Sequence, residues 1–285
     1  NISGAKHWDD LANDIDNKIK KYKKTDDNLR ILDIGSNSGD LISSFQRLNW
    51  IGVGIEPSPK PFEIALQRGI KTINKFYNFS ILNELPFDDF DLITFTNSFP
   101  HIPNPVDTLK LSRELIKKES GIICIESPSS QKMIAEGQYD QIYHQHMTYL
   151  DIYSFNYLCK NLNLKLFDYE ISEFHNGSIR YFISALNSPY QISSKLTDYL
   201  SKIDKEDYLS EKSEKIFKEK CEKHRNRLRN ILSKIKEENK SVGCVSAPAK
   251  GNTILNYCGI NNNDIMFASE ANKLKIGRFT PLSNI

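Results

Sequence analysis

Apolar residues recur with two different spacings along this chain, and the two spacings alternate. Trp8, Leu11, Ile15, Ile19 and Tyr22 fall three or four positions apart, which predicts an amphipathic helix. Continuous apolar runs and further helix-like stretches follow in turn. The runs predict strands at 30–35, 50–55, 91–96 and 121–125, and the stretches predict helices at 41–48, 61–68 and 106–118. This alternation is typical of an α/β fold, a parallel sheet covered by helices.

The pattern changes after about residue 190. Two apolar runs before that point, 164–171 and 179–186, predict strands at one edge of the sheet. Residues 203–240 carry Lys and Glu in mixed order, which favours a long solvated helix packed along one face over a nucleic-acid arm. The apolar stripe of that helix consists of Leu209, Ile216, Cys221, Leu228, Ile231 and Ile235. Strand, helix and strand patterns then return at 241–246, 252–257 and 265–269.

These changes predict three segments. They are an α/β domain over 1–188, a helical section over 189–240 and a smaller α/β lobe over 241–285.

Composition narrows the classes of partner. The chain has 285 residues, and 38 basic and 36 acidic side chains leave a formal charge of only +2, so we expect neither a nucleic acid nor a membrane as partner. The five cysteines are widely spaced without a CxxC pair, which argues against a zinc ribbon and a disulfide framework. No apolar run reaches about 18 residues and no signal peptide opens the chain, so we expect a cytoplasmic protein.

The first predicted strand runs into a glycine-rich loop. The string is Leu32-Asp33-Ile34-Gly35-Ser36-Asn37-Ser38-Gly39-Asp40. A strand, such a loop and a helix together bring backbone N–H groups close to a ligand, although a plain tight turn has the same local pattern. The loop lacks the G-x-G-x-x-G of a dinucleotide site and the Gly-Lys of a P-loop. It resembles the first motif of class I methyltransferases that use S-adenosylmethionine (SAM), with Asp33 as the acidic residue before the loop.

Later positions support a SAM site. Glu56, followed by Pro57, closes the second strand, where a carboxylate can accept both ribose hydroxyls and would repel a 2′-phosphate. Asn78, Phe79 and Ser80 lie between the predicted third and fourth strands, where this fold contacts adenine. Asn97 ends the fourth strand, beside the expected sulfonium. We therefore predict SAM as the cofactor, bound by Asp33, Gly35, Ser36, Asn37, Gly39, Glu56, Pro57, Asn78, Phe79, Ser80 and Asn97.

A second constellation follows the fifth strand, at 139–149. His144 and His146 stand two apart and are flanked by tyrosines. As metal ligands they would need a third partner such as His101 or His175, and nothing in the sequence demands one, so we predict no metal. A histidine suits a general base because its pKa lies near working pH, and an aromatic-rich packing loop is the alternative.

Nearly the whole chain resembles the C-methyltransferases that act on nucleotide-linked deoxy ketosugars in antibiotic and surface-polysaccharide biosynthesis. The first motif is common to many methyltransferases, and the others are more specific and occur in the family's order. The resemblance rests on the blocks 33–39, Tyr139-Asp-Gln-Ile-Tyr-His-Gln-His146, His175-Asn-Gly-Ser-Ile-Arg180, Ala247-Pro-Ala-Lys-Gly-Asn-Thr-Ile-Leu-Asn-Tyr257 and Asn272-Lys-Leu-Lys-Ile-Gly-Arg278.

The resemblance implies a SAM-binding domain over 1–188 and a Rossmann-like C-terminal lobe that holds a sugar nucleotide, the small-molecule partner, between the lobes. His146 would be the base and Tyr143 its partner near the sugar carbonyl, while Arg180, Lys250 and Asn252 would hold the sugar or its diphosphate. The implied catalytic residues are His146, Tyr143, His144 and Gln145. The implied substrate-binding residues are His101, His175, Asn176, Ser178, Arg180, Lys250, Asn252 and Asn256.

The sequence departs from the family's pattern in three places. Gln145 stands where members usually carry a glutamate, and an amide cannot orient a cationic histidine by charge. Val245-Ser246 replaces a Tyr-Gly pair, and the cysteine-rich zinc domain that precedes the family's methyltransferase domain is not in this chain. Two alternatives therefore stand beside carbon methylation: an O- or N-methyltransferase on a sugar nucleotide or other small metabolite, and a catalytically silent module that binds SAM or the sugar nucleotide.

Overall fold

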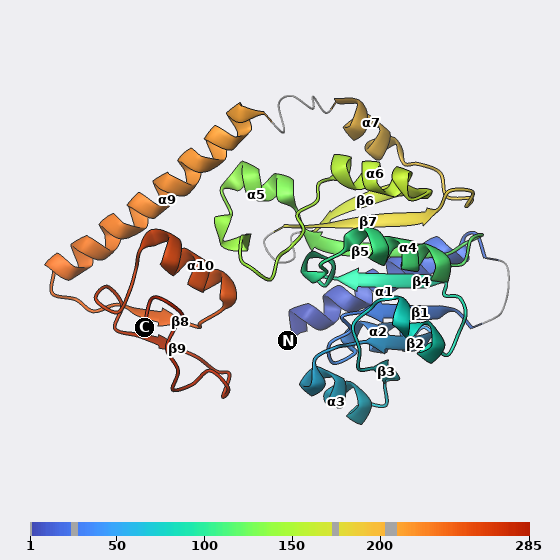
Figure 1. Cartoon of the computed structure of the whole chain (residues 1–285), viewed down its shortest axis with the longest axis horizontal. Coiled ribbons are helices and arrows are strands. Elements are labelled where there is room, and N and C mark those ends of the chain that lie inside the picture. The colour runs from blue at the N-terminus through green and yellow to red at the C-terminus, as the bar shows by residue number, and fades with distance from the viewer. Residues whose placement is uncertain (1, 24–27, 173–176, 203–209) are drawn as a thin grey trace. The chain divides into compact units, whose positions relative to one another are not determined.

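The computed structural model describes residues 2–23, 28–172, 177–202 and 210–285 (Figure 1). The chain divides into two compact units. Unit 1 comprises residues 1–129 and 147–202, and unit 2 comprises residues 130–146 and 203–285. These units differ from the predicted segments, whose boundaries lie at 188 and 240, because residues 130–146 group with the C-terminal part of the chain.

A seven-stranded sheet forms the centre of unit 1, in the order β3-β2-β1-β4-β5-β7-β6. The neighbours from β3 to β5 are parallel, and β7 is antiparallel to both β5 and β6. This arrangement confirms the predicted α/β class, with a mixed sheet in place of a wholly parallel one. The strands are β1 (Arg30–Ile34), β2 (Ile51–Ile55), β3 (Thr72–Ile73), β4 (Leu92–Thr96), β5 (Ile122–Pro128), β6 (Leu164–Ser172) and β7 (Ser178–Ala185).

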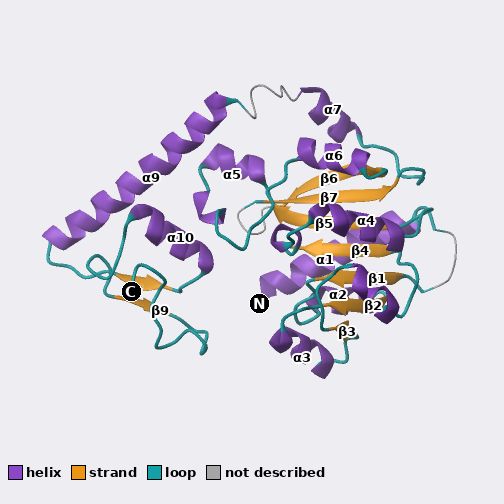
Figure 2. Ribbon diagram, in the orientation of Figure 1, coloured by secondary structure: helices purple, strands orange, loops and turns teal. Residues whose placement is uncertain are grey.

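Helices cover both faces of this sheet (Figure 2), which explains why its central strands are continuous apolar runs. On one face of the sheet, Ile15 of α1 and Phe45 of α2 pack in a core with Ile31 of β1. On the opposite face, Leu109 of α4 and Phe155 of α6 pack in a second core. The helices of unit 1 are α1 (Ile2–Lys20), α2 (Asp40–Gln46), α3 (Pro59–Gln67), α4 (Pro105–Leu115), α6 (Ile152–Asn161) and α7 (Ser194–Lys202), with 3-10 turns η1 (Phe79–Glu84) and η2 (Phe99–His101).

Unit 2 has its own small core and a two-stranded parallel sheet of β8 and β9. Tyr139 is buried with Cys221 of α9 and Cys258 of α10, and its hydroxyl lies 2.7 Å from Nδ1 of His224. This anchor explains why the segment 130–146 packs with the C-terminal part of the chain. The elements are α5 (Ser130–Glu136), η3 (Tyr139–Gln141), α9 (Glu211–Glu237), β8 (Gly243–Val245), α10 (Ala249–Cys258) and β9 (Phe267–Ser269).

The long charged helix is present as α9, but part of its predicted apolar stripe is wrong. Ile216 and Ile231 are exposed, and Leu209 lies outside the described residues. Cys221 is buried, and Phe217 and Leu232 pack beside it instead. When apolar residues are few, side chains at i+3 and at i+4 form two neighbouring rows on the helix surface. The sequence pattern does not show which of the two rows packs against the rest of the unit. Among the helices of the described residues, none is long and apolar enough to cross a membrane.

Candidate active site

The glycine loop after β1 has little room for side chains. Gly35 has φ +73°, in the left-handed region, and its N–H donates to the carbonyl of Ile55 at 2.8 Å. A Cβ on Gly35 would lie 2.5 Å from the Cβ of Ser98. The loop is therefore a cradle with no room for a side chain at position 35, because Ser98 occupies that space, and a backbone without side chains is what close approach of a ligand requires.

A matched pair of glycines tests the cradle. Gly69 has φ +74°, nearly the same backbone conformation, but a Cβ there would meet nothing within 4 Å. We expect Gly69→Ala to cost about 1 kcal/mol, the strain of a left-handed alanine. Gly35→Ala should cost about 1–3 kcal/mol more through the clash, and should weaken SAH binding. Urea denaturation and calorimetric titration of SAH measure the two effects, and equal costs would contradict the cradle.

Glu56 organises the loop from the end of β2. Its side chain is buried, Oε2 accepts the N–H of Asn37 at 2.9 Å, and Oε1 accepts the N–H of Ser58 at 2.7 Å. A carboxylate offers about four acceptor positions, so two remain after these bonds. The residue predicted to accept a ribose diol thus retains the capacity for two hydroxyl donors.

Asp33 lies beneath the loop with its carboxyl group buried. The Thr94 hydroxyl donates to Oδ1 at 2.7 Å. Burial raises the pKa of Asp33 from 3.8 to about 7, opposed by the Thr94 hydrogen bond and reinforced by the negative charge of Glu56. Near neutral pH this carboxyl group therefore stands between its two protonation states.

The raised pKa of Asp33 has a stability consequence. Because the folded value lies above the unfolded value, the native state binds the proton more tightly between about pH 4 and pH 7. The contribution of this group is fully present below the lower pKa and is lost as pH rises through the upper one. We expect Asp33→Asn, which cannot ionise, to lose less stability than wild type between pH 5 and pH 8 in urea denaturation. Parallel losses in both proteins would contradict this assignment.

The other predicted cofactor residues surround the same end of the sheet. Pro57 follows Glu56, and Asn97 follows β4 with φ +56° and donates its N–H to the carbonyl of Glu126 at 2.8 Å. Asn78 caps η1 by accepting the N–H of Ser80, and Phe79 is half exposed. Within the described residues the buried Ser36 hydroxyl has no hydrogen-bond partner. An orphaned hydroxyl, a glycine cradle and a carboxylate with two acceptor positions fit a nucleoside cofactor such as SAM.

In unit 2 the structure brings Tyr143 and His146 together. The Tyr143 hydroxyl lies 2.8 Å from Nε2 of His146, and Nδ1 of His146 lies 2.9 Å from the carbonyl oxygen of Gln141. A carbonyl oxygen only accepts, so Nδ1 carries the hydrogen and Nε2 has the lone pair that accepts the tyrosine O–H. His146 is thereby held in the tautomer whose outer nitrogen can take a proton. Burial raises the pKa of Tyr143, so its hydroxyl stays protonated.

A cavity of about 1330 Å³ in unit 2 is larger than the roughly 300–1,000 Å³ of most small-ligand pockets. Tyr143 and His144 line it, as do the predicted substrate residues Asn252 and Asn256. Lys250 lies at the first turn of α10, where burial lowers its pKa and the carboxylate of Asp140 opposes the shift. Ala249 and Gly251 line the cavity, whereas Lys250 between them is not among the described residues that line it. The cations of the lining include Lys275 and Arg278.

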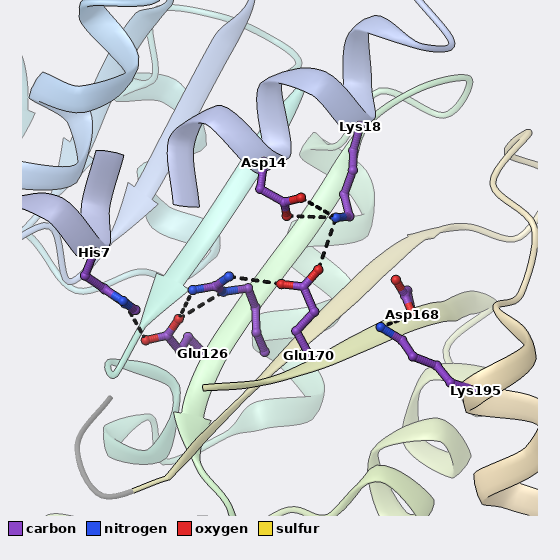
Figure 3. Close-up of polar contacts among 8 residues, drawn as sticks. His7, Asp14, Lys18, Glu126, Asp168, Glu170 and Lys195 are labelled. Atoms are coloured by element: carbon purple, nitrogen blue, oxygen red, sulfur yellow. Dashed lines mark hydrogen bonds and ion pairs between the residues drawn. The ribbon is translucent and has the colours of Figure 1, made fainter. Parts of the chain in front are cut away.

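Arg180 lies in a buried network of charges in unit 1. Figure 3 shows the two carboxylates of this network, Glu126 and Glu170, with His7 and Lys18 of α1. Its Nε and Nη2 donate to Oε2 of Glu126 at 3.0 and 2.7 Å, and its Nη1 donates to Glu170 at 3.1 Å. Glu126 also bonds His7 of α1, and Glu170 bonds Lys18 of the same helix. Burial alone would raise the pKa of Glu126, but its bond to His7 and the charge of Arg180 hold the pKa below its ordinary range. A phosphate would therefore compete with two carboxylates for this guanidinium group.

The remaining predicted residues are spread over the chain. His101 ends η2 and is exposed, and Gln145 is exposed beside His144. Ser178 is fully buried at the start of β7, and His175 and Asn176 lie outside the described residues. In the part of the chain that the structure describes, no three His, Cys, Asp or Glu side chains are grouped to hold a metal ion.

The polar lining of the cavity includes Glu270, a residue that the sequence did not single out. Glu270 follows β9 and Ser246 follows β8, and both line the cavity together with Lys275. A signal for Glu270 was available, because a carboxylate directly after the second strand of a strand–helix–strand unit is also the position of Glu56.

Two family matches agree with this architecture. The chain belongs to the methyltransferase family described as "Methyltransferase domain", which matches residues 7–168. Residues 173–285 match the family described as "C-methyltransferase C-terminal domain".

Individual proteins resemble the chain more distantly. The C-methyltransferase NovU of Streptomyces niveus is 24% identical over 273 residues, which cover 95% of this chain and 64% of NovU, so this chain spans about two thirds of that relative. The plantazolicin methyltransferase BpumL in complex with a monoazolic desmethylPZN analog and SAH is 15% identical with a TM-score of 0.46, covering 61% of this chain and 82% of BpumL. A SAM-dependent methyltransferase from Archaeoglobus fulgidus is 17% identical with a TM-score of 0.45, covering 58% and 72%.

Proposed function

We propose that this protein is a SAM-dependent C-methyltransferase whose acceptor is a nucleotide-linked deoxy ketosugar. The observation that carries the proposal is the Tyr143–His146 pair, whose geometry leaves a basic nitrogen directly behind a tyrosine that lines a cavity of ligand size. The match to the C-methyltransferase C-terminal domain supports carbon as the atom that receives the methyl group.

The cofactor would be held in unit 1. The backbone of the loop from Gly35 to Gly39 would lie against it, Glu56 would accept its ribose hydroxyls, and Asp33 would provide a carboxylate beneath the loop. Asn78, Phe79 and Ser80 would lie along the adenine, and Asn97 with Pro57 would complete the wall. When bound, SAM supplies an electrophilic methyl group on a good leaving group, the sulfonium. These assignments remain our proposals for the individual residues.

The chemistry of this chain's own residues is a proton transfer. A carbon next to a ketone gives its proton to the oxygen of Tyr143 as the tyrosine hydrogen passes to Nε2 of His146, which becomes the imidazolium. His144, also in the lining, donates to the enolate oxygen that forms. Tyr143 stays neutral overall, which its raised pKa requires. Methyl transfer then needs the carbanion in line with the donor at about 3–3.5 Å.

Turnover on a panel of acceptors tests the class of substrate. The purified protein is incubated with SAM and with nucleoside-diphosphate sugars in pairs, one member carrying a ketone and the other the corresponding alcohol, and SAH is quantified. We expect SAH to form with ketosugars and to stay at background with the alcohols, which have no acidified C–H bond. Turnover with the alcohols would instead support the O-methyltransferase alternative, and binding without any turnover would support a silent module.

A further inference from the structure

The small sheet of unit 2 repeats the local geometry of the cofactor loop in unit 1. In both, two parallel strands flank a helix: β1 and β2 with α2, and β8 and β9 with α10. Ser246 follows β8 with φ +73°, the angle that Gly35 has after β1. The N–H of Ser246 donates to the carbonyl of Ser269, the last residue of β9, at 2.8 Å, just as Gly35 donates to Ile55 at 2.8 Å.

The repeat extends to a carboxylate. Glu270 follows the last residue of β9, as Glu56 follows the last residue of β2. Oε2 of Glu270 accepts the N–H of Ala247 in the loop after β8 at 3.2 Å, which matches the bond from Asn37 to Glu56. The Glu270 side chain is 14% exposed and lines the cavity of unit 2. The second unit therefore has the loop and carboxylate of a second nucleoside site.

The two carboxylates differ in the acceptor positions that they retain. Oε1 of Glu270 accepts two backbone N–H groups, from Ala271 at 2.9 Å and from Asn272 at 3.0 Å, and Oε2 accepts one. With about four positions on a carboxylate, the hydrogen bonds of the described residues leave two at Glu56 and one at Glu270, on Oε2, the oxygen that the Lys275 ammonium approaches to 3.5 Å. Glu56 can thus accept a diol, whereas Glu270 can accept a single hydroxyl.

Other atoms of the same cavity independently indicate a polar ligand. The Oδ1 atom of Asn252, one turn into α10, is buried and has no hydrogen-bond partner among the described residues. A buried acceptor without a donor costs about 1–3 kcal/mol, which a ligand donor would recover. Lys275 lies 3.5 Å from Oε2 of Glu270, and Arg278 lines the cavity too, so cations suited to a diphosphate stand near the carboxylate.

We propose that Glu270 binds one furanose hydroxyl of a nucleoside diphosphate in the cavity of unit 2. This inference rests on the proposed function, since it places the nucleotide part of the acceptor. It makes Glu270 a recognition residue for the sugar of the nucleotide, distinct from Glu56, which serves the cofactor. One of the two deoxy counterparts of a ribonucleotide, the 2′-deoxy or the 3′-deoxy form, therefore lacks the hydroxyl that the carboxylate accepts.

A cycle of protein and ligand changes tests the proposal. ADP, CDP, GDP, UDP and dTDP are first titrated into the full chain by calorimetry, and the nucleotide that binds most tightly is compared with its ribo, 2′-deoxy and 2′,3′-dideoxy forms. In wild type we expect removal of one of the two hydroxyls to weaken binding about tenfold or more, the effect of losing a hydrogen bond to a charged group. In Glu270→Gln the same removal should have little further effect. Because the coupling is read from ligand changes within each protein, a general weakening of the variant does not imitate it.

Glu56→Gln is the matched control at the other carboxylate. It should weaken SAH and leave nucleoside-diphosphate binding unchanged, whereas Glu270→Gln should do the reverse. The inference would be overturned if removal of a hydroxyl weakened binding equally in wild type and in Glu270→Gln, or if the effects of both hydroxyls depended on Glu270. Neither result would contradict the proposed substrate class. Failure of wild type to bind any of the five diphosphates would overturn the sugar-nucleotide acceptor as well.

Discussion

Replacing His146 with alanine is expected to lower the rate of methyl transfer by about 10²–10⁴-fold, the usual contribution of a positioned general base. The physical reason is that Nε2 of His146 is the final acceptor of the proton that Tyr143 passes on. SAH affinity should be unchanged, because the loop and carboxylate proposed for the cofactor lie in unit 1 and His146 lies in unit 2. SAH formation under saturating SAM and calorimetric titration of SAH measure the two quantities.

Two further results separate a base from a merely structural histidine. Added imidazole should partly restore turnover in His146→Ala, since it can occupy the space of the lost ring and take the proton. Tyr143→Phe should be about as inactive as His146→Ala, because the hydroxyl that lines the cavity links the acceptor to Nε2. Undiminished turnover in His146→Ala would rule out the base, and full activity in Tyr143→Phe would rule out the relay.

Replacing Arg180 with methionine is expected to destabilise unit 1 by about 3–5 kcal/mol, the cost of removing the guanidinium charge from a buried carboxylate that keeps its bond to His7. The carboxylate is Glu126, whose side chain is only 1% exposed. Urea denaturation followed by circular dichroism gives the change in the free energy of unfolding. Removing both partners together, in Arg180→Met with Glu126→Gln, should cost less than the single change, because no unpaired charge then stays buried.

Lys110→Met is the control for this experiment. Lys110 pairs with Asp107 at 3.2 Å on α4, and both side chains are about half exposed. Loss of an exposed pair should change stability by less than about 1 kcal/mol. If Arg180→Met is as stable as wild type and loses only affinity for the sugar nucleotide, the stabilising role of this charge network is contradicted. Such a result would support Arg180 as a substrate-binding residue.

The sequence predicts the parts of the fold that follow from a long, regular pattern. The strands at 30–34, 51–55, 92–96 and 122–128 are mostly apolar and are buried on both faces, so their runs stand out against the flanking loops. The β3 strand has only two residues, too short for a period to appear. Helix α6 begins at a capping box of Asp151 and Ser154, whereas the usual box carries Glu or Gln at the second position, which hides the signal.

The candidate site could be predicted one residue at a time, but its grouping could not. The motif at 139–149 precedes the last two strands of unit 1 in the chain, so sequence order assigns it to the first domain. Residues 139–146 of this motif belong to unit 2, where Tyr139 is buried against α9 and α10. Tyr139 and its contact Cys258 are 119 positions apart in the chain, which no local pattern reveals. Arg180 is a different case, because an arginine in a specific motif suggests a phosphate ligand, and the sequence does not show that its guanidinium group bonds Glu126 and Glu170.

The position of the transferred methyl group tests the central proposal most directly. The protein is incubated with SAM labelled with carbon-13 at the methyl group and with a nucleotide-linked deoxy ketosugar, and the product is examined by carbon-13 and proton correlation NMR. We predict a labelled methyl group bonded to the ring carbon next to the ketone, with loss of the proton that this carbon carried. A labelled methyl on oxygen or nitrogen would contradict carbon methylation.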